Sequence, residues 1–312
     1  MASIYLGANA AVGIGEESTW GTAVSRSNWL PLISTTMQRN LVKVPRPTLR
    51  VGTLGAMRRA HFTSETVVGG DIVVEATHQS MGMLLKGVLG GAASTGSGPY
   101  VHTYKIGALV AGHTIEINRG TGTSERFDGC RFESATFDVS AGGVMTLTCG
   151  LIGKISAART TLASPSISAT DLPILHSQCG TLAWGGNTFT LSSMNVTINN
   201  SLARRQLLGA TVTAQPLIND FQSVEMSVTL EVEDQLLTDQ LNDTEGDAVI
   251  TFSSGANSTA FTIQNAYLSS CTDPISTSGV ISQSATLVGQ SDGTDEGLKI
   301  VVTNGSSSAT AN

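Results

Sequence analysis

Short apolar runs, many of them alternating with polar residues, recur along almost the whole chain. Clear examples lie at 100–106, 113–118 and 224–232, and turns rich in glycine and serine separate them. Alternation with a period of two is typical of strands with one buried and one exposed face. The 34 glycines and the charged fraction of 13% agree, because turns use glycine and buried sheets leave few charged positions. The sequence therefore predicts a mainly β fold.

The predicted order of elements occurs twice. A strand region at 66–75 runs into an amphipathic helix at 77–89, and a strand at 224–232 runs into a helix at 234–241. The tripeptide Ala141-Gly142-Gly143 predicts a tight hairpin. The other predicted strands are 100–106, 113–118, 127–139, 143–153, 189–198, 247–253, 258–265, 266–273 and 279–288.

Weak sequence similarity accompanies this repeated order. Ile72–Ala76 is similar to Val228–Val232, and five residues of the first half match five of the second at a constant offset of 136. These are Phe132, Ser134, Ser140, Gly143 and Gly153 against Leu268, Ser270, Ser276, Gly279 and Gly289. We interpret the pattern as an internal duplication. The predicted division is a first domain at 1–155, a linker at 156–178, a second domain at 179–303 and a flexible tail at 304–312.

The net charge of −7 conceals a strong asymmetry along the chain. Residues 18–64 hold seven basic side chains and no acid, whereas residues 206–312 hold thirteen acids and Lys299 as their one base. Prolines and the lack of helical periodicity predict that the basic segment is an extended arm or a long hairpin loop. Six of its bases are candidate contacts between subunits: Arg39, Lys43, Arg46, Arg50, Arg58 and Arg59.

Three interpretations of this arm remain open: a solvated loop, a DNA-binding segment, or a segment that docks on an acidic patch of a like subunit. The acidic net charge and the aromatic fraction of 5% oppose broad affinity for nucleic acid. Docking is favoured because the same chain supplies the complementary charge. Such a head-to-tail contact produces closed rings or open filaments.

The sequence offers no convincing catalytic constellation. It lacks a Gly-x-Ser-x-Gly motif, and Gly153-Lys154 is followed by Ile155 where a phosphate-binding loop needs Ser or Thr. The five histidines form no closely spaced pair, and the four cysteines form no Cys-x-x-Cys pair, so we expect no metal, no cofactor and buried thiols. A hydrolase is therefore disfavoured. A carbohydrate-binding or adhesin module that stacks sugars on Trp20, Trp29 and Trp184 is the alternative function.

We expect no targeting or membrane-spanning segment in this sequence. No apolar stretch approaches the roughly 18 residues that a membrane span needs, and the first residues lack a basic segment followed by an apolar core. We therefore expect the chain to stay in the cytoplasm where it is made, without a membrane partner.

The opening Gly13-Ile-Gly-Glu-Glu-Ser-Thr-Trp-Gly-Thr-Ala23 resembles the signature that begins tail tube (major tail) proteins of long, non-contractile phage tails. The basic arm, the strand Gly69–Glu75, the helix that ends Leu-Leu-Lys-Gly-Val-Leu, the strand Tyr100–Tyr104 and the segment Phe127–Ser134 resemble that family in the same order. The resemblance covers about residues 10–155, and the second half resembles the family through its strand-helix-strand order.

This resemblance implies a fold, a function and partners. The fold would be two tandem β-sandwich or rolled-sheet domains, each with one short flanking α-helix and a long loop. The protein would be a non-enzymatic virion protein that is assembled in the host cytoplasm into stacked rings, the hollow tail tube through which DNA is ejected. Its partners would be further copies of itself, the tape measure protein and the tail terminator and tip proteins. DNA would pass without specific binding.

The resemblance also gives the basic arm a role, because the corresponding loop of that family touches neighbouring subunits and the next ring. Two ring stoichiometries follow. Three chains would give six domains and a pseudo-six-fold ring if both halves are tube-type domains, whereas six chains are needed if the second half decorates the outside. The repeated strand and helix order favours three.

Overall fold

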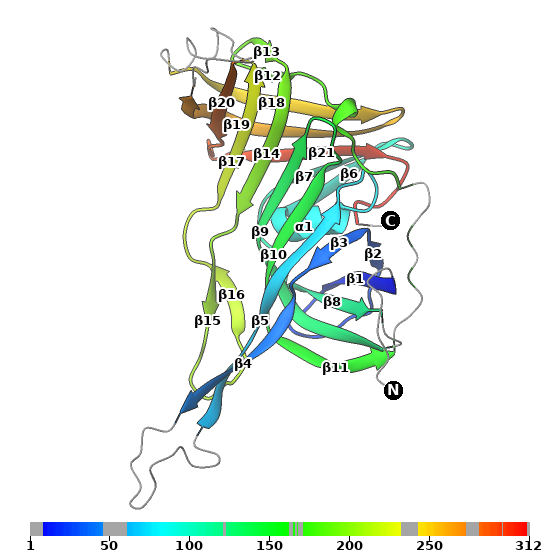
Figure 1. The fold of residues 1–312 in the computed structure, drawn as a ribbon, viewed down its shortest axis with the longest axis vertical. Coiled ribbons are helices and arrows are strands. Elements are labelled where there is room, and N and C mark those ends of the chain that lie inside the picture. Colours follow the sequence, from blue (N-terminus) through cyan, green and yellow to red (C-terminus); the bar gives the residue numbers. More distant parts are fainter. Residues whose placement is uncertain are drawn as a thin grey trace, which may run out of the picture.

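Among the described residues, nineteen strands join in one hydrogen-bonded network, and two further strands form a separate hairpin. This is the arrangement in a computed structural model, which describes residues 9–45, 61–120, 123–161, 165, 167, 171–231, 243–272, 281–294 and 296–310. Figure 1 shows an elongated molecule in which long strands run along the main axis and one short helix lies beside them. The mainly β fold predicted from the alternating pattern is confirmed.

The first half of the chain contributes eleven strands and the helix. In chain order these are β1 (Ala10–Glu17), β2 (Asn28–Leu30), β3 (Leu32–Thr35), β4 (Gln38–Pro45), β5 (His61–Glu75), α1 (Gly82–Leu89), β6 (Gly90–Thr95), β7 (Tyr100–Ile106), β8 (Gly112–Arg119), β9 (Thr123–Ser140), β10 (Thr146–Gly153) and β11 (Ile155–Thr161). Strand β10 pairs with β5 and β9, and β9 pairs also with β8 and β11, all antiparallel.

The described part of the second half contributes ten strands and one short 3₁₀ turn. These are η2 (His176–Gln178), β12 (Leu182–Trp184), β13 (Asn187–Phe189), β14 (Leu191–Asn199), β15 (Leu202–Arg205), β16 (Ala214–Ile218), β17 (Ser223–Glu231), β18 (Glu245–Ser254), β19 (Asn257–Thr272), β20 (Ser282–Val288) and β21 (Leu298–Asn304). Strand β20 pairs with β17 and β19, and β19 pairs also with β18 and β21. The pairing order of the first half therefore recurs.

Two bulges recur together with the pairing order. The β9–β10 ladder skips Glu133, and the β19–β20 ladder skips Ser269, which lies 136 residues later. A second irregularity in the β8–β9 ladder has its counterpart in the β18–β19 ladder. Gly129 and Asn265, again 136 residues apart, take left-handed backbone conformations there, with φ of 67° and 48°. Bulges are specific features of a ladder, so their matched positions are stronger evidence of similarity than strand order alone.

Strands from the two halves also pair with each other. Strand β14 lies antiparallel to β9, with Ser193 opposite Ser140 and Asn199 opposite Ser134. Strand β21 pairs with β7 in the same way. The two halves therefore share one sheet network and one hydrophobic core, and the division into two domains is not visible as a gap between them.

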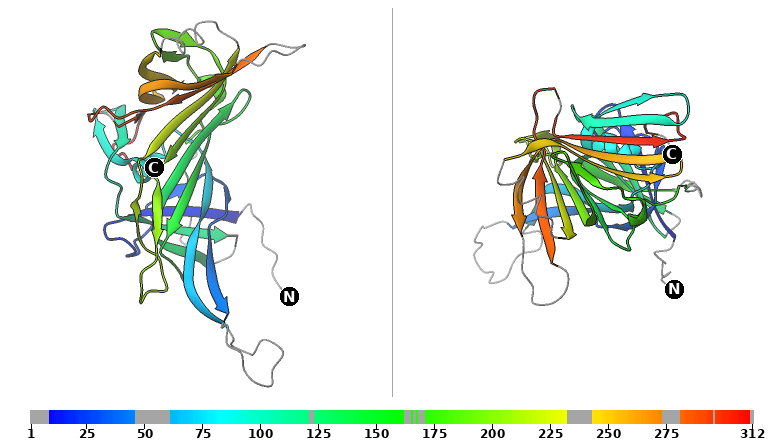
Figure 2. Two further views of the ribbon diagram at one scale, coloured as in Figure 1. Left: turned by 90° about the vertical axis from the view of Figure 1, so that its left-hand side faces the viewer. Right: turned by 90° about the horizontal axis from the view of Figure 1, so that it is seen from above.

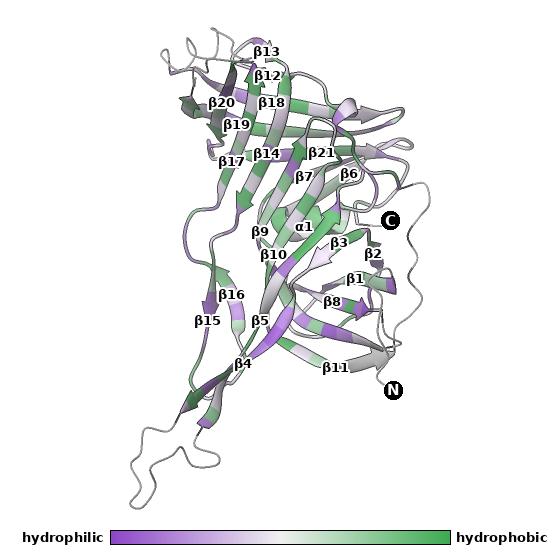
Figure 3. Cartoon of the chain, viewed as in Figure 1, coloured by the Kyte–Doolittle hydropathy of each residue, from purple (hydrophilic) through white to green (hydrophobic). Residues whose placement is uncertain are grey.

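Helix α1 forms part of the hydrophobic core. Every residue of α1 except Lys86 is buried, and the helix packs against β1, β6, β7 and β9. Figure 3 shows hydrophobic residues along α1 and the neighbouring strands. The helix can lie this close to β9 because position 87 is glycine: a Cβ there would be 2.4 Å from the Phe132 ring. Lys86 pairs with Glu16 of β1 at 2.7 Å and so ties the exposed side of the helix to the sheet.

Several local predictions need correction. Helix α1 begins at Gly82, not at residue 77, because Thr77 and Ser80 form a hydrogen-bonded turn through their hydroxyl groups. The strands predicted at 258–265 and 266–273 are one strand, β19, which continues through the bulge at Asn265. The predicted hairpin at Ala141–Gly143 is confirmed between β9 and β10. The predicted helix at 234–241 lies outside the described residues.

The predicted linker and tail are attached to the sheet where they are described. The linker prediction at 156–178 overlaps β11, which pairs with β9, and Ile174 is buried and exchanges backbone hydrogen bonds with Ala76 and Met145. The tail predicted at 304–312 is held by polar contacts up to residue 310. The hydroxyl of Tyr104 donates to the carbonyl of Ala309, and the amide of Asn28 donates to that of Thr310. These contacts connect the described part of the predicted tail to β7 and β2.

Candidate subunit interface

Strands β4 and β5 form a two-stranded ribbon, which we call the arm, that projects from the sheet (Figures 1 and 2). Strand β4 pairs with the first half of β5, from Gln38 opposite Gly69 to Pro45 opposite His61. Among the described residues no other strand pairs with β4, and all eight of its residues are exposed. The sequence prediction of an arm over 18–64 is too wide, because Asn28–Leu30 forms the buried strand β2.

The arm carries both charged and apolar side chains in solvent. Arg39 and Lys43 lie on β4, opposite Val68 and Thr63, and neither forms an ion pair with a described residue. Three apolar side chains of β4 are 37–48% exposed: Leu41, Val42 and Val44. The structure thus brings two of the six predicted contact residues onto one exposed ribbon. Arg46, Arg50, Arg58 and Arg59 lie outside the described residues.

A second projection, the hairpin formed by β15 and β16, lies beside the arm. The backbone amide of Thr66 in the arm donates to the carbonyl of Thr211 at 2.7 Å. The guanidinium of Arg204 donates to the carbonyl of Val68 at 3.1 Å. The two projections therefore contact each other near the turn of the hairpin, although they come from different halves of the chain.

The hairpin β15–β16 and its connection to β17 expose large apolar side chains. Leu208 is fully exposed and Phe221 is 92% exposed, and Leu207, Leu217 and Ile218 are each about half exposed. Clustered apolar residues on a surface mark interaction sites, whereas single ones are ordinary. The sequence pattern predicts no element between the strands at 189–198 and 224–232, and so it does not indicate this surface. The segment does contain the large apolar residues Leu207, Leu208, Leu217, Ile218 and Phe221, but the sequence pattern does not show that the fold leaves them exposed.

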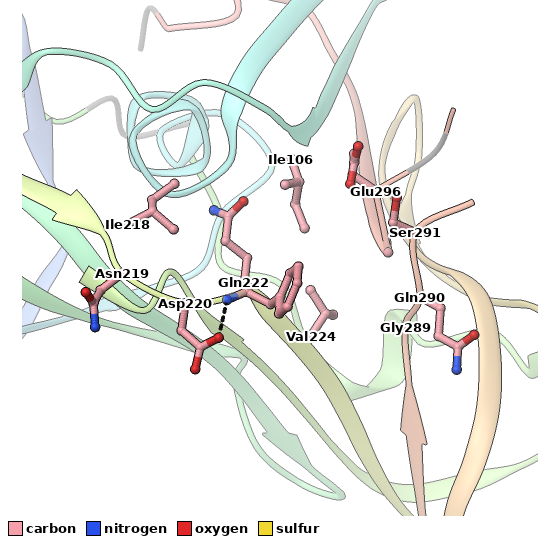
Figure 4. Close-up of a pocket in the computed structure, with 12 residues that line it drawn as sticks. Ile106, Ile218, Asn219, Asp220, Gln222, Val224, Gly289, Gln290, Ser291 and Glu296 are labelled. Atoms are coloured by element: carbon pink, nitrogen blue, oxygen red, sulfur yellow. Dashed lines mark hydrogen bonds between the residues drawn. The ribbon is translucent and has the colours of Figure 1, made fainter. Parts of the chain in front are cut away.

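An open groove of about 810 Å³ lies where the hairpin meets β17. Figure 4 shows Ile106, Ile218 and Val224 among the side chains that line it. Asp220 and Glu296 add two carboxylates, and no basic residue is among its lining residues. The groove therefore combines apolar walls with negative charge.

The N-terminal signature residues act in the interior of this protein. The buried carboxylate of Glu17 accepts hydrogen bonds from the backbone amides of Gly21 and Gly129, at 2.7 and 2.9 Å, and from the Thr114 hydroxyl at 2.8 Å. The indole of Trp20 donates to the carbonyl of Gly129 at 3.0 Å. These bonds join β1, β8 and β9, so the signature stabilises the protomer and does not form a catalytic site.

The tryptophans do not form a platform for sugars. Trp184 and Trp29 are buried, and the Trp184 indole donates to the carbonyl of Ala266 at 3.2 Å. The ammonium group of Lys154 lies 4.9 Å from the centre of the Trp20 ring. The carbohydrate-binding alternative therefore lacks an open set of aromatic faces.

Burial shifts the pKa values of a histidine and of two cysteines in the interior. Burial lowers the pKa of His113 to about 3, and the positive charges of Lys86 and Arg131 act in the same direction. Burial also raises the pKa of the thiols of Cys130 and Cys149, which keeps them protonated. Cys179 and Cys271 are half-buried. Across the described ranges, no group of His, Cys, Asp and Glu is arranged to hold a metal ion.

Comparison with known proteins gives one assignment. A family model described as phage tail tube protein matches residues 7–290, which is nearly the whole chain. A comparison with curated proteins finds no match. Within the described residues, no helix has the length and apolar character to cross a membrane.

Proposed function

This chain belongs to the phage tail tube protein family, and from that premise we propose that its copies close into rings that stack into a hollow tube for DNA ejection. The protein is a structural, non-enzymatic component of the phage tail. Its function is therefore to assemble, and its functional site is the surface through which copies contact each other. The tape measure protein and the terminator and tip proteins are the proposed partners at the inside and the ends of this tube.

The repeated register of the two halves is the observation that carries the proposed ring. Both bulges and the left-handed residue recur at a spacing of 136 residues, which supports an origin of the two halves from one tube-type unit. Three such chains supply six similar units, so we propose three chains per ring with pseudo-six-fold symmetry. The alternative is six chains per ring with the second half outside the tube.

The arm fits the proposed contact between subunits. Arg39 and Lys43 are exposed and lack ion-pair partners among the described residues, and the chain beyond residue 205 is strongly acidic. We assign Arg39, Lys43, Arg46, Arg50, Arg58 and Arg59 to contacts with neighbouring copies in the same or the next ring. An acidic protein also suits a DNA channel, because acidic side chains repel phosphates and avoid the salt-dependent affinity that bases would add.

Cryo-electron microscopy of purified tubes tests the proposal. We expect rings of three chains in which each ring shows six similar lobes around an open channel. Rings of six whole chains would overturn the stoichiometry. Protein that stays monomeric at every concentration and salt condition would overturn the tube itself.

A further inference from the structure

We propose that the groove beside the second hairpin receives the arm of a second copy of this chain. This inference rests on the proposed function, since it names the surface that an arm occupies in an assembly of copies. The occupant is the β4 strand, and the receptor is the groove formed by residues 218–224 together with residues 289–297.

The groove exposes charged and aromatic side chains that the described residues of one copy do not cover. One oxygen of Asp220 accepts the backbone amide of Phe221 at 2.8 Å, which holds this carboxylate at the groove (Figure 4). Neither Asp220 nor Glu296 forms an ion pair with another described residue. Phe221 is 92% exposed and lines the same groove as the two acids. An aromatic ring and two carboxylates that a single copy leaves in solvent are complementary to an apolar segment with positive charge.

The β4 strand is such a segment. Its exposed apolar residues, Leu41, Val42 and Val44, alternate with or flank the bases Arg39 and Lys43. Eight residues of extended chain span about 26 Å, which is long enough to place apolar side chains against Phe221 and Ile218 while the bases approach the two carboxylates. The ribbon form of the arm also presents β4 without the need to unfold any of the sheet.

The arm of the same copy is directed elsewhere. It contacts its own hairpin near the turn, where Thr66 bonds to Thr211, whereas the groove lies at the opposite end of the hairpin, where β16 leads into β17. The ribbon of β4 and β5 extends away from that end of the hairpin (Figure 1). A different copy must therefore supply the occupant. The contact joins two different surfaces, so it is heterologous and propagates from copy to copy.

Photo-crosslinking of the full chain locates the arm directly. A photoreactive amino acid replaces Lys43 in heavy-isotope protein, which is mixed with unlabelled protein, allowed to assemble and irradiated. We expect mixed-isotope cross-links between the arm and peptides containing residues 218–222 or 289–297. If tubes form but the cross-links map to other surfaces, the groove assignment is overturned while the proposed tube stands. If the wild-type protein forms no assembly, both are overturned.

A charge exchange gives the second test. Asp220→Lys with Glu296→Lys should raise the protein concentration needed for assembly at least tenfold, and Arg39→Glu with Lys43→Glu in the same chain should recover most of that loss. Glu231→Lys is the matched control, because Glu231 is exposed at the far end of β17 and should leave assembly unchanged. Unchanged urea midpoints establish that the variants fold. Folded groove variants that assemble like the wild type would overturn the inference.

Discussion

The interior of the sheet network and the projecting arm differ in how far their charged side chains are paired. Inside, Glu17 accepts three hydrogen bonds, and Glu116 pairs with Arg26 and accepts the Ser124 hydroxyl, so both buried carboxylates are satisfied. On the arm, Arg39 and Lys43 have no ion-pair partner among the described residues. A single copy therefore satisfies these two buried carboxylates but leaves the two bases of its arm without ion-pair partners among the described residues.

This difference distinguishes residues that stabilise the folded protomer from residues that act in assembly. Substitutions in the interior should lower the free energy of unfolding and affect assembly only through the loss of folded protein. Substitutions on the hairpins should change assembly while the free energy of unfolding stays within about 0.5 kcal/mol of the wild type. The four predictions that follow test this separation, in order of decreasing expected effect.

Reversal of the two described arm charges should have the largest effect. We expect Arg39→Glu with Lys43→Glu to raise the concentration needed for tube formation about 100-fold, equivalent to about 3 kcal/mol, because each reversal replaces an attraction with a repulsion. Sedimentation velocity measures the assembly, and urea unfolding measures the protomer. The charge-conserving pair Arg39→Lys with Lys43→Arg is the control. A comparable loss of unfolding free energy would show that the arm serves folding.

Removal of the buried Glu17 carboxylate should destabilise the protomer. Glu17→Ala leaves two backbone amides and the Thr114 hydroxyl without their acceptor, so we expect a loss of about 2–3 kcal/mol in urea unfolding. The neighbouring Glu16→Ala removes a partly exposed ion pair with Lys86 and should cost less than about 1 kcal/mol. Equal losses for both variants would contradict the structural role of the signature glutamate.

Much of this interior could be predicted from sequence because strand signals are local. The predicted strand at 100–106 coincides with β7, and the glycine hairpin at 141–143 lies where two predicted strands meet. The offset of 136 residues, first seen as weak identity, coincides with the spacing of the matched bulges. Asn265 was misread as a break between strands, because a left-handed bulge and a turn favour the same residue types.

The candidate interface was predicted only in part. The run of bases without acids identifies Arg39 and Lys43 as available charges from composition alone. The second hairpin could not be recognised, because its position depends on long-range contacts such as Arg204 with Val68, and these leave no periodic signal in the sequence. The exposure of Leu208 and Phe221 likewise follows from what the folded chain leaves uncovered, which local alternation does not encode.

Substitution of Phe221 in the groove should show that the second hairpin contributes to assembly through apolar contact, whereas the arm contributes through charge. We expect Phe221→Ser to raise the assembly concentration about tenfold, because a largely exposed ring loses the surface that a partner would bury. The effect of Phe221→Ser on the assembly concentration should persist at about 0.3 M salt. The effect of the arm charge reversal should become smaller, because salt screens charges. Leu172→Ser is the control, since Leu172 is 67% exposed outside the groove. Equal salt sensitivity of the two contributions would contradict their assignment to different forces.

The buried His113 should produce the smallest effect at neutral pH. Neither ring nitrogen makes a well-formed hydrogen bond, although the backbone of Cys130 lies nearby, and the ring packs edge-on against Phe132 at 5.1 Å between centroids. Replacement by a side chain of similar size without polar atoms, His113→Leu, should therefore raise the free energy of unfolding at pH 7 by about 1 kcal/mol.

The pH dependence separates this interior effect from any effect on the hairpins. The pKa of His113 is about 3 in the folded state and near 6.5 when unfolded, so the unfolded chain takes up the proton first. The wild type should therefore be fully stabilised above pH 6.5 and lose stability progressively as the pH falls toward 3, with a slope of up to about 1.4 kcal/mol per pH unit from this group. In urea unfolding between pH 7 and 4, His113→Leu should lack the part of the stability loss that is due to His113. The exposed arm substitution His61→Leu should show the same stability loss as the wild type. An identical pH profile for wild type and His113→Leu would mean that the buried ring is not the source of the acid sensitivity.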